Sequence, residues 1–223
     1  GDERKHTSRP QRTLRKHGFA GKVIPINPNR TEIQGDRAYP SLLEVPDNID
    51  HAFVMVPRDA VPEALTQCAA KHVPIATVYT DGFAEKGPEG MRMQQEVLRI
   101  AREGGVRILG PNCSGIYSSR PSCALSVNAV IERLEIASGP LALISQSGSM
   151  AGGLLSRGLG RGAGFSKVVS IGNECDLSVG EIAEWLVDDP ETGAILLFME
   201  TIRFAPRLAE AARRAVEAGK PII

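Results

Sequence analysis

Residues 140–160, PLALISQSGSMAGGLLSRGLG, decide the fold class of this chain. The apolar run at its start is typical of a buried strand, and small residues lead from it directly into a helical pattern over 147–160. Such a unit places backbone N–H groups and hydroxyls at a helix N-terminus, where the helix dipole favours a phosphate or another oxyanion. Ser145, Ser147 and Ser149 are equally suited to capping the helix, so the local pattern leaves both interpretations open.

The same alternation of strand and helix recurs along most of the chain. Apolar runs predict strands at 22–28, 51–57, 74–80, 106–111, 140–145, 165–171 and 193–200, with the opening of another at 220–223. Helical patterns predict helices at 8–17, 59–71, 88–103, 147–160, 178–189 and 206–219. We expect Asp59 to cap the second of these helices. Alternating segments of this kind are typical of βαβ units, so we predict an α/β fold with parallel sheets.

A less regular stretch, 112–138, is predicted to connect two domains, the first over 1–125 and the second over 138–223. A doubly wound domain normally opens with a strand and a glycine-rich phosphate turn, and neither precedes the first predicted helix. The strand at 220–223 has no continuation. We therefore expect both domains to be incomplete in this sequence.

The charge balance argues against two kinds of partner. The 223 residues hold 26 Lys and Arg against 26 Asp and Glu, so no net field draws the chain onto nucleic acid or an anionic membrane. Residues 1–22 are basic, which suits either attraction of nucleotide phosphates or a solvated helix face. The polar start has no signal-peptide core, and no apolar run approaches the roughly 18 residues of a membrane span, so we expect a cytoplasmic protein.

Cysteine and histidine positions exclude several chemistries. The four cysteines form no CxxC pair, so we predict no metal site and no dithiol redox motif. Cys113 has no visible activating partner and is interpreted as a buried structural thiol. All four histidines lie at or before His72, so Ser147 has no downstream base and a serine hydrolase is not expected.

Polar loops follow the predicted strands of the first half. Val56-Pro57, Thr80-Asp81-Gly82 and Asn112 each come directly after one strand. Open α/β sheets bind ligands at the carboxyl ends of their strands, so these loops could together enclose an extended ligand such as a nucleotide derivative. Ordinary turns are the default interpretation of each loop taken alone. Glu200 also ends a strand, but its spacing alone favours a salt bridge to Arg203 or simple exposure.

Eight segments in order resemble the NDP-forming acyl-CoA synthetase family, which includes succinyl-CoA synthetase. They are GFAGKVIPINPN, VPRDAV, DGFAEKG, GPNC, LISQSGS, SIGNECD, DDPETGAILLFMETIR and GKPII. The resemblance extends from about residue 17 to the last residue. It implies a Rossmann-like CoA-binding domain followed by a flavodoxin-like ligase domain.

The resemblance also implies a set of site residues. Those implied to bind CoA, from its adenosine end toward its pantetheine end, are Pro28, Asn29 and Arg30, then Val56 and Pro57, then Thr80, Asp81 and Gly82, and finally Asn112. Those implied to bind the phosphoryl group are Ser145, Gln146, Ser147 and Gly148. Glu200 matches the family carboxylate that holds the active-site histidine, which replaces the interpretation drawn from its spacing.

The family makes an acyl-CoA from a carboxylic acid, CoA and a nucleoside triphosphate, through an acyl phosphate and a phosphohistidine. The sequence departs from the common pattern at Ser114 and at SQSGSM, and no histidine here can be the phosphorylated one. The resemblance therefore implies that the histidine and an ATP-grasp region, which binds ATP or ADP and Mg, come from outside these residues, in the same chain or in a partner subunit. A homo-oligomer is compatible with it.

Two other functions stay open from the sequence. A non-catalytic CoA-binding module of a protein acetyltransferase shares this architecture. An NAD-dependent oxidoreductase fits the strand and helix pattern but lacks a GxGxxG turn.

Overall fold

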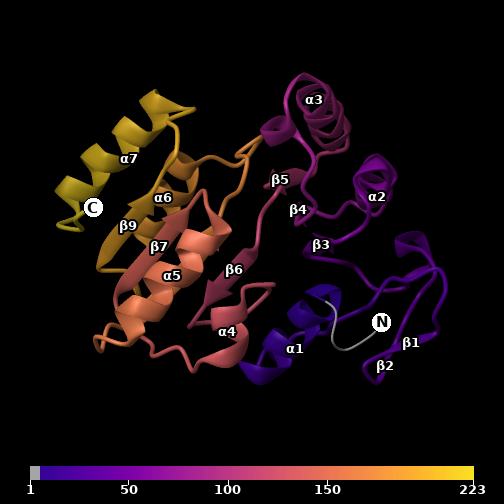
Figure 1. The fold of residues 1–223 in the computed structure, drawn as a ribbon, viewed down its shortest axis with the longest axis horizontal. Coiled ribbons are helices and arrows are strands. Elements are labelled where there is room, and N and C mark those ends of the chain that lie inside the picture. Colours follow the sequence, from indigo (N-terminus) through magenta and orange to yellow (C-terminus); the bar gives the residue numbers. More distant parts are fainter. Residues whose placement is uncertain (1–5) are drawn as a thin grey trace.

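Two larger sheets lie side by side in the computed structural model, which describes residues 6–223, and a small antiparallel pair of strands accompanies the first of them (Figure 1). The first half of the chain builds a parallel three-stranded sheet, and the second half builds a four-stranded sheet whose core is parallel. Helices pack on both sheets. The predicted α/β class is confirmed.

The elements follow the predicted order closely. The helices are α1 (Arg9–Lys16), α2 (Val61–Ala70), α3 (Pro88–Glu103), α4 (Ala129–Arg133), α5 (Gly148–Leu159), α6 (Val179–Asp188) and α7 (Ala205–Glu217), with 3-10 turns η1 (His6–Ser8), η2 (Leu42–Glu44), η3 (Arg58–Ala60) and η4 (Ala84–Lys86). The strands are β1 (Glu32–Ile33), β2 (Asp36–Arg37), β3 (Ala52–Val54), β4 (Ile75–Val78), β5 (Arg107–Leu109), β6 (Gly115–Ser118), β7 (Leu141–Ser145), β8 (Phe165–Ser170) and β9 (Ala194–Phe198). Within residues 6–223, no helix has the length and apolar character needed to cross a membrane.

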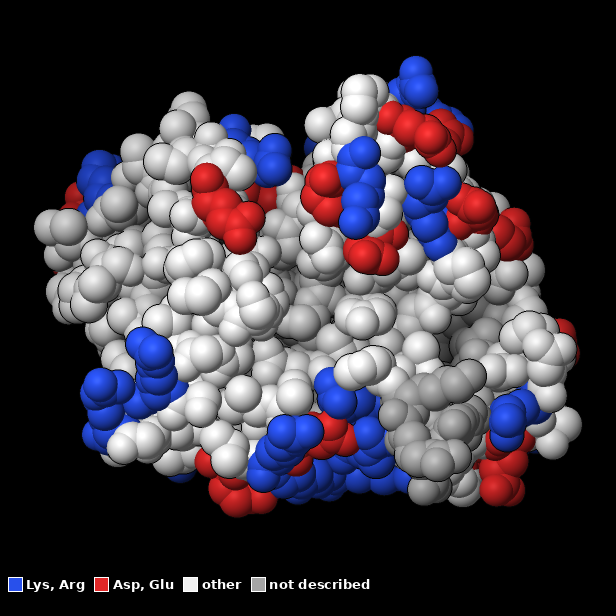
Figure 2. All heavy atoms as spheres, viewed as in Figure 1, with Lys and Arg blue, Asp and Glu red and all other residues white. Residues whose placement is uncertain are grey.

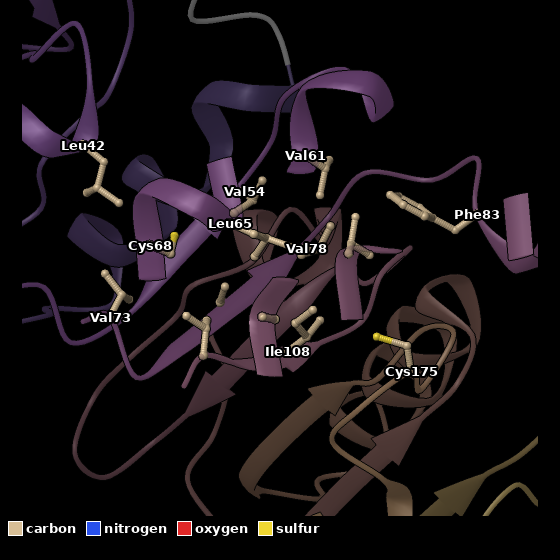
Figure 3. Close-up of a cluster of buried hydrophobic side chains, with 14 of the residues drawn as sticks. Leu42, Val54, Val61, Leu65, Cys68, Val73, Val78, Phe83, Ile108 and Cys175 are labelled. Carbon is tan, nitrogen blue, oxygen red and sulfur yellow. The ribbon is translucent and has the colours of Figure 1, made fainter. Parts of the chain in front are cut away.

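The first sheet has the order β3-β4-β5 and packs against α2 and α3. Apolar side chains from the strands and from both helices form one core, part of which is drawn in Figure 3. Leu65 on α2 and Ile108 on β5 are fully buried there, as is Phe83 in the loop after β4. Burial of such side chains stabilises a fold by roughly 1.5–3 kcal/mol each.

Two local predictions in this half are wrong. The segment 22–28 forms no strand and pairs with the chain only through a single bridge, Ile26 to Tyr39. Pro25 and Pro28 supply no backbone N–H groups, which prevents a regular ladder there. Asp59 is not an N-cap, because a 3-10 turn occupies Arg58–Ala60 and α2 begins without a side-chain cap.

The second sheet has the order β6-β8-β7-β9 and buries both faces. Alternate residues of β7 point to opposite sides, as the period of a strand requires. Ala142 and Ile144 pack in the cluster formed with α6 and α7, whereas Leu143 packs in the cluster formed with α5. The opening strand predicted at 220–223 contributes a parallel bridge between Ile222 and Ile195 on β9.

We predicted that the stretch 112–138 only connects the two domains, but it also forms part of the second one. It contains β6, which pairs antiparallel with β8, and the short helix α4. Strand β6 has only four residues, GIYS, and it begins with glycine and ends with serine. Its sequence therefore gives little indication of a strand. Its position depends on the distant strand β8, which local pattern cannot reveal.

A segment from the second half of the chain also covers one edge of the first sheet. Residues 173–177 run beside the free edge of β5, where the Leu177 N–H donates to the Ile108 carbonyl at 3.1 Å and the Cys175 N–H donates to the Gly110 carbonyl at 3.0 Å. The Cys175 side chain belongs to the core of the first sheet (Figure 3). The two halves of the chain therefore share backbone hydrogen bonds and a hydrophobic core at this edge.

Basic side chains of α1 are paired with acidic groups nearby. Arg9 and Arg12 both form ion pairs with Glu132 on α4, and Arg15 pairs with Asp36 on β2. Figure 2 shows blue and red atoms together along the lower edge of this face, where Figure 1 places α1 and α4. The basic charge of α1 thus serves contacts within the fold.

Candidate functional site

Three of the predicted loops meet at the carboxyl edge of the first sheet. The Thr80 hydroxyl, after β4, donates to the Val56 carbonyl, after β3, at 2.6 Å. The Asn112 N–H, after β5, donates to the Thr80 carbonyl at 3.0 Å. Pro57 and Asp81 are exposed beside these contacts. The parallel order of the strands brings these loops together, as expected for ligand loops of an open α/β sheet.

Glu85 holds the loop that contains Gly82. Its carboxylate accepts hydrogen bonds from the N–H groups of Gly82 at 2.5 Å and Phe83 at 3.1 Å, and from the Asn173 amide at 2.5 Å. Burial opposes ionisation of Glu85, but these hydrogen bonds outweigh it and hold the pKa of the carboxyl below its ordinary value. The loop after β4 is therefore fixed by residues from both halves of the chain.

The loop predicted to contact the adenosine end shares no polar contact, among the described residues, with the other predicted loops. Pro28, Asn29 and Arg30 are exposed, and Asn29 donates its N–H to the Asn27 side chain at 2.9 Å. Among residues 6–223, no hydrogen bond or ion pair joins these three residues to the loops after β3, β4 or β5. A cavity of about 410 Å³ lies between α1 and the segment 21–24, but it is lined by none of the predicted site residues.

Asn112 stands where the two halves touch. It has a left-handed backbone (φ 57°), its side chain is exposed, and its amide donates to the Asn173 side chain at 3.4 Å. Gly172 (φ 62°) packs against the same loop so closely that a methyl carbon there would lie 2.2 Å from the Pro111 carbonyl oxygen. Only glycine fits this approach of two backbones.

The SQSG turn begins α5 next to that loop. Ser147 is the N-cap, and its hydroxyl accepts from the Met150 N–H at 3.4 Å and lies 3.0 Å from the Ser149 hydroxyl. Ser145 is fully buried and donates its hydroxyl to the Ser147 carbonyl at 2.7 Å. A methyl carbon placed at Gly148 would lie 3.1 Å from the Ser114 hydroxyl, so the GPNCSG loop and the turn are in contact.

Gln146 is engaged differently from its serine neighbours. Its buried side-chain amide accepts from the N–H groups of Glu200 and Thr201 and donates to Glu174 and to the Thr201 carbonyl. Its own N–H donates to the Phe198 carbonyl at 3.0 Å. The Gln146 side chain therefore has no hydrogen-bonding group left for a ligand.

Comparison with known proteins identifies the relatives of this arrangement. Residues 2–119 match the CoA binding domain family, and residues 138–223 match the family described as succinyl-CoA ligase like flavodoxin domain. The alpha subunit of acetate–CoA ligase [ADP-forming] I from Pyrococcus furiosus is 37% identical over 216 residues, covering 95% of this chain and 46% of that subunit. The chain belongs to the NDP-forming acyl-CoA synthetase family.

Further members of this family agree. Acetate–CoA ligase [ADP-forming] I from Archaeoglobus fulgidus is 36% identical over 92% of this chain, which covers 29% of that protein. The apo structure of dinucleotide forming acetyl-coenzyme A synthetase 1 from Ca. Korarchaeum cryptofilum superposes with a TM-score of 0.92 at 33% identity, covering 99% of this chain and 47% of that one. The chain thus spans less than half the length of these relatives.

Glu200, the carboxylate that the family resemblance singles out, is exposed in the loop two residues beyond β9. Within the described residues its carboxylate has no hydrogen bond and no ion pair, so the salt bridge to Arg203 that spacing favoured is not formed. Its backbone is held by Gln146 at 2.7 Å.

Cys113 is buried beside β8. Its thiol donates to the Ser170 carbonyl at 2.7 Å, and burial raises its pKa to about 12. Such a thiol is almost entirely protonated near neutral pH and is a poor nucleophile. The structural interpretation of Cys113 fits this environment.

Sequence reasoning missed three residues that organise the site. Glu85, Asn173 and Glu174 link the loops of one sheet to those of the other. Asn173 and Glu174 lie in the SIGNECD segment, whose resemblance to the family was noted without a role for either side chain. The contacts join residues that are 88 and 28 positions apart, so no local spacing predicts them.

Proposed function

We propose that this chain forms the CoA-binding and first ligase domains, over 1–125 and 138–223, of an enzyme that joins a small carboxylic acid to CoA. ATP would be converted to ADP and phosphate through acyl phosphate and phosphohistidine intermediates. One observation carries the proposal: Gly148 of the SQSG turn packs against Ser114 of the GPNCSG loop. This contact joins the loops suited to CoA to a helix terminus suited to phosphate.

CoA would lie along the carboxyl edge of the first sheet. We assign its binding to Pro28, Asn29, Arg30, Val56, Pro57, Thr80, Asp81, Gly82 and Asn112. Arg30 is exposed and has no ion pair among residues 6–223, which leaves its charge available to a CoA phosphate. The exposed carboxylate of Asp81 and the amide of Asn112 suit the amide groups of a pantetheine chain.

The phosphoryl group would bind at the N-terminus of α5. The N–H groups of Gly148 and Ser149 lie in the first turn, where a helix offers them no acceptor. The hydroxyl of Ser147 is adjacent and only half-buried. Ser145 and Gln146 would support this turn through their internal hydrogen bonds, and Glu200 would hold the histidine that carries the phosphoryl group.

The remaining machinery would come from outside these residues. The sequence has no histidine after His72, and within the described residues none of the four forms a hydrogen bond with the SQSG turn or with Glu200. We therefore assign the phosphohistidine, ATP or ADP, and Mg to an ATP-grasp region and its neighbours, in the same polypeptide or in a partner subunit. All four cysteines are free, which suits a cytoplasmic enzyme, and a homo-oligomer is compatible with the fold.

Calorimetric titration of the intact enzyme with CoA tests the CoA assignment, with NADH as the competing ligand. We expect CoA to bind and NADH not to bind. Arg30→Ala and Asn112→Ala should weaken CoA binding, whereas Arg99→Ala, on the exposed face of α3, should not. Absence of CoA binding would refute the assignment.

A panel of acids then tests the substrate class. The relatives include acetate–CoA ligases, a trans-feruloyl-CoA synthase and a 4-hydroxybutyrate–CoA ligase, so acetate, trans-ferulate and 4-hydroxybutyrate are the first acids to try. We expect at least one to give ADP only when CoA is present. ADP formation that does not depend on CoA or on any acid would contradict a synthetase.

A further inference from the structure

The side-chain amide of Gln146 is saturated by contacts inside the protein. Its Oε1 accepts from the N–H groups of Glu200 at 2.7 Å and Thr201 at 3.0 Å. Its Nε2 donates to Glu174 Oε2 and to the Thr201 carbonyl, both at 2.8 Å. A primary amide offers two donor hydrogens and two acceptor lone pairs, so all of its capacity is used.

These contacts are the main restraint on the loop after β9. Within residues 6–223, the backbone groups of 200–203 form no hydrogen bonds other than the three with Gln146. The side chains of 200–204 are all exposed, so packing restrains the loop little. The position of Glu200 therefore depends on Gln146 more than on its own strand.

Glu174 determines which way the Gln146 amide points. It is only 3% exposed and has a left-handed backbone (φ 55°). Its Oε1 accepts from the Val179 N–H at 2.7 Å, and its Oε2 accepts from Gln146. Because a carboxylate can only accept here, Nε2 must face it, and Oε1 then faces the two N–H groups of the loop.

The same segment reaches the loops of the first sheet. Asn173, beside Glu174 in the chain, donates to Glu85, and Glu85 accepts from the Gly82 N–H. Adjacent side chains thus connect the loop assigned to CoA with the loop that carries Glu200. Both loops are therefore hydrogen-bonded, through Glu85 and through Gln146, to the segment that contains Asn173 and Glu174.

We propose that Gln146 is a positioning residue for Glu200 and that Glu174 sets its orientation. The pair holds the loop of Glu200 against the turn at the start of α5. This inference rests on the proposed function, because it affects catalysis only if Glu200 holds the histidine of an acyl-CoA synthetase. A displaced carboxylate would misalign that histidine, and a misplacement of about 1 Å can cost about 100-fold in rate.

Three variants of the intact enzyme test the pair. Gln146→Leu removes all four hydrogen bonds of the amide. Gln146→Glu replaces the amide with a carboxylate, which would face the carboxylate of Glu174 and repel it. The double variant Gln146→Glu with Glu174→Gln returns a donor to the contact between the two side chains, although the Thr201 carbonyl loses its donor. Gln95→Glu, an exposed glutamine on α3, is the matched control.

The first measurement is deuterium exchange of the peptide containing Glu200 and Thr201. We expect the two amides to exchange about tenfold faster in Gln146→Leu and Gln146→Glu, to recover partly in the double variant, and to be unchanged in Gln95→Glu. Exchange in the strand β7 should stay slow in all four. If Gln146→Leu does not fold, the exchange rates of Glu200 and Thr201 in Gln146→Glu and in the double variant test the proposal instead. Unchanged exchange of Glu200 and Thr201 in the single variants would overturn the proposal.

The second measurement is acyl-CoA formation. We expect kcat to fall by about tenfold to 100-fold in the single variants while the KM for CoA changes less than about twofold, with partial recovery in the double variant. Faster exchange without a loss of kcat would overturn the positioning role. A wild-type enzyme that makes no acyl-CoA would refute the proposed function instead, and the exchange data would still decide whether the pair holds the loop.

Discussion

Arg107 on β5 donates two hydrogen bonds of 2.9 Å to the buried carboxylate of Glu181 on α6. A third hydrogen bond, of 2.8 Å, joins Arg107 to Asp176. Together with the backbone contacts of 173–177, this bidentate pair fastens the second half of the chain to the edge of the first sheet. The carboxyl ends of the two sheets consequently keep a fixed separation, which a site built from both requires.

Loss of the Arg107 guanidinium should destabilise this junction. Glu181 is 5% exposed and, among residues 6–223, would keep only Arg207 as an ion-pair partner, at 3.3 Å. Because Arg107 itself is partly exposed, solvent screening limits the effect, and we expect Arg107→Met to lower the free energy of unfolding by about 1–2 kcal/mol. Urea unfolding measures this. Arg99→Met, which breaks only exposed pairs on α3, should change the midpoint little, and equal effects of both variants would contradict the assignment.

Gly172 should tolerate no side chain. It combines a left-handed backbone with contact to the Pro111 carbonyl, so Gly172→Ala should lower the free energy of unfolding by about 1–3 kcal/mol. Gly153, inside α5, has nothing within 4 Å of the added carbon, and Gly153→Ala should raise stability by about 0.5–1 kcal/mol. Thermal unfolding of the two variants gives opposite shifts if this geometry is correct. A Gly172→Ala variant as stable as the parent would contradict it.

Sequence periodicity located every α-helix except the five-residue α4, because each of the others buries a stripe of its own residues, as α3 does over Pro88–Glu103. It also located the loops after β3, β4 and β5, because parallel strands share one carboxyl edge. It could not find β6, whose partner β8 is distant, or the chain of contacts through Asn173 and Glu174. Those features depend on how the two halves meet. The assignments of CoA and phosphoryl contacts came from resemblance and stay predictions.

Ser147 should affect both stability and activity. Removing its hydroxyl takes away the N-cap of α5, which typically costs about 1 kcal/mol. Ser178 caps α6 in the same way, accepting from the Glu181 N–H at 3.1 Å. Ser147→Ala and Ser178→Ala should therefore lower the melting temperature similarly, but only Ser147→Ala should lower kcat by about tenfold or more. Equal kcat in the two variants would show that Ser147 only caps its helix.

Buried thiols should make stability fall at alkaline pH. Burial raises the pKa of Cys113 and of Cys175 from 9.0 to about 12, and that of Cys68 to about 11. Above pH 9 the unfolded chain releases these protons while the folded chain retains them, so the free energy of unfolding decreases as pH rises toward 12. Urea midpoints between pH 8 and about 10.5 should show this decline, and Cys113→Ala should make it shallower. A slope that Cys113→Ala does not alter would contradict the burial of an un-ionised thiol.

The central claim is that this chain supplies the CoA and phosphoryl contacts of an acyl-CoA synthetase. The most direct measurement is product formation by the intact enzyme with ATP, CoA and the acid panel, following ADP and acyl-CoA together in the wild type, Asn112→Ala and Ser147→Ala. We predict equal amounts of ADP and acyl-CoA from the wild type, a raised KM for CoA in Asn112→Ala, and a lowered kcat in Ser147→Ala. Formation of no acyl-CoA from any acid, or kinetics that neither substitution changes, would contradict the claim.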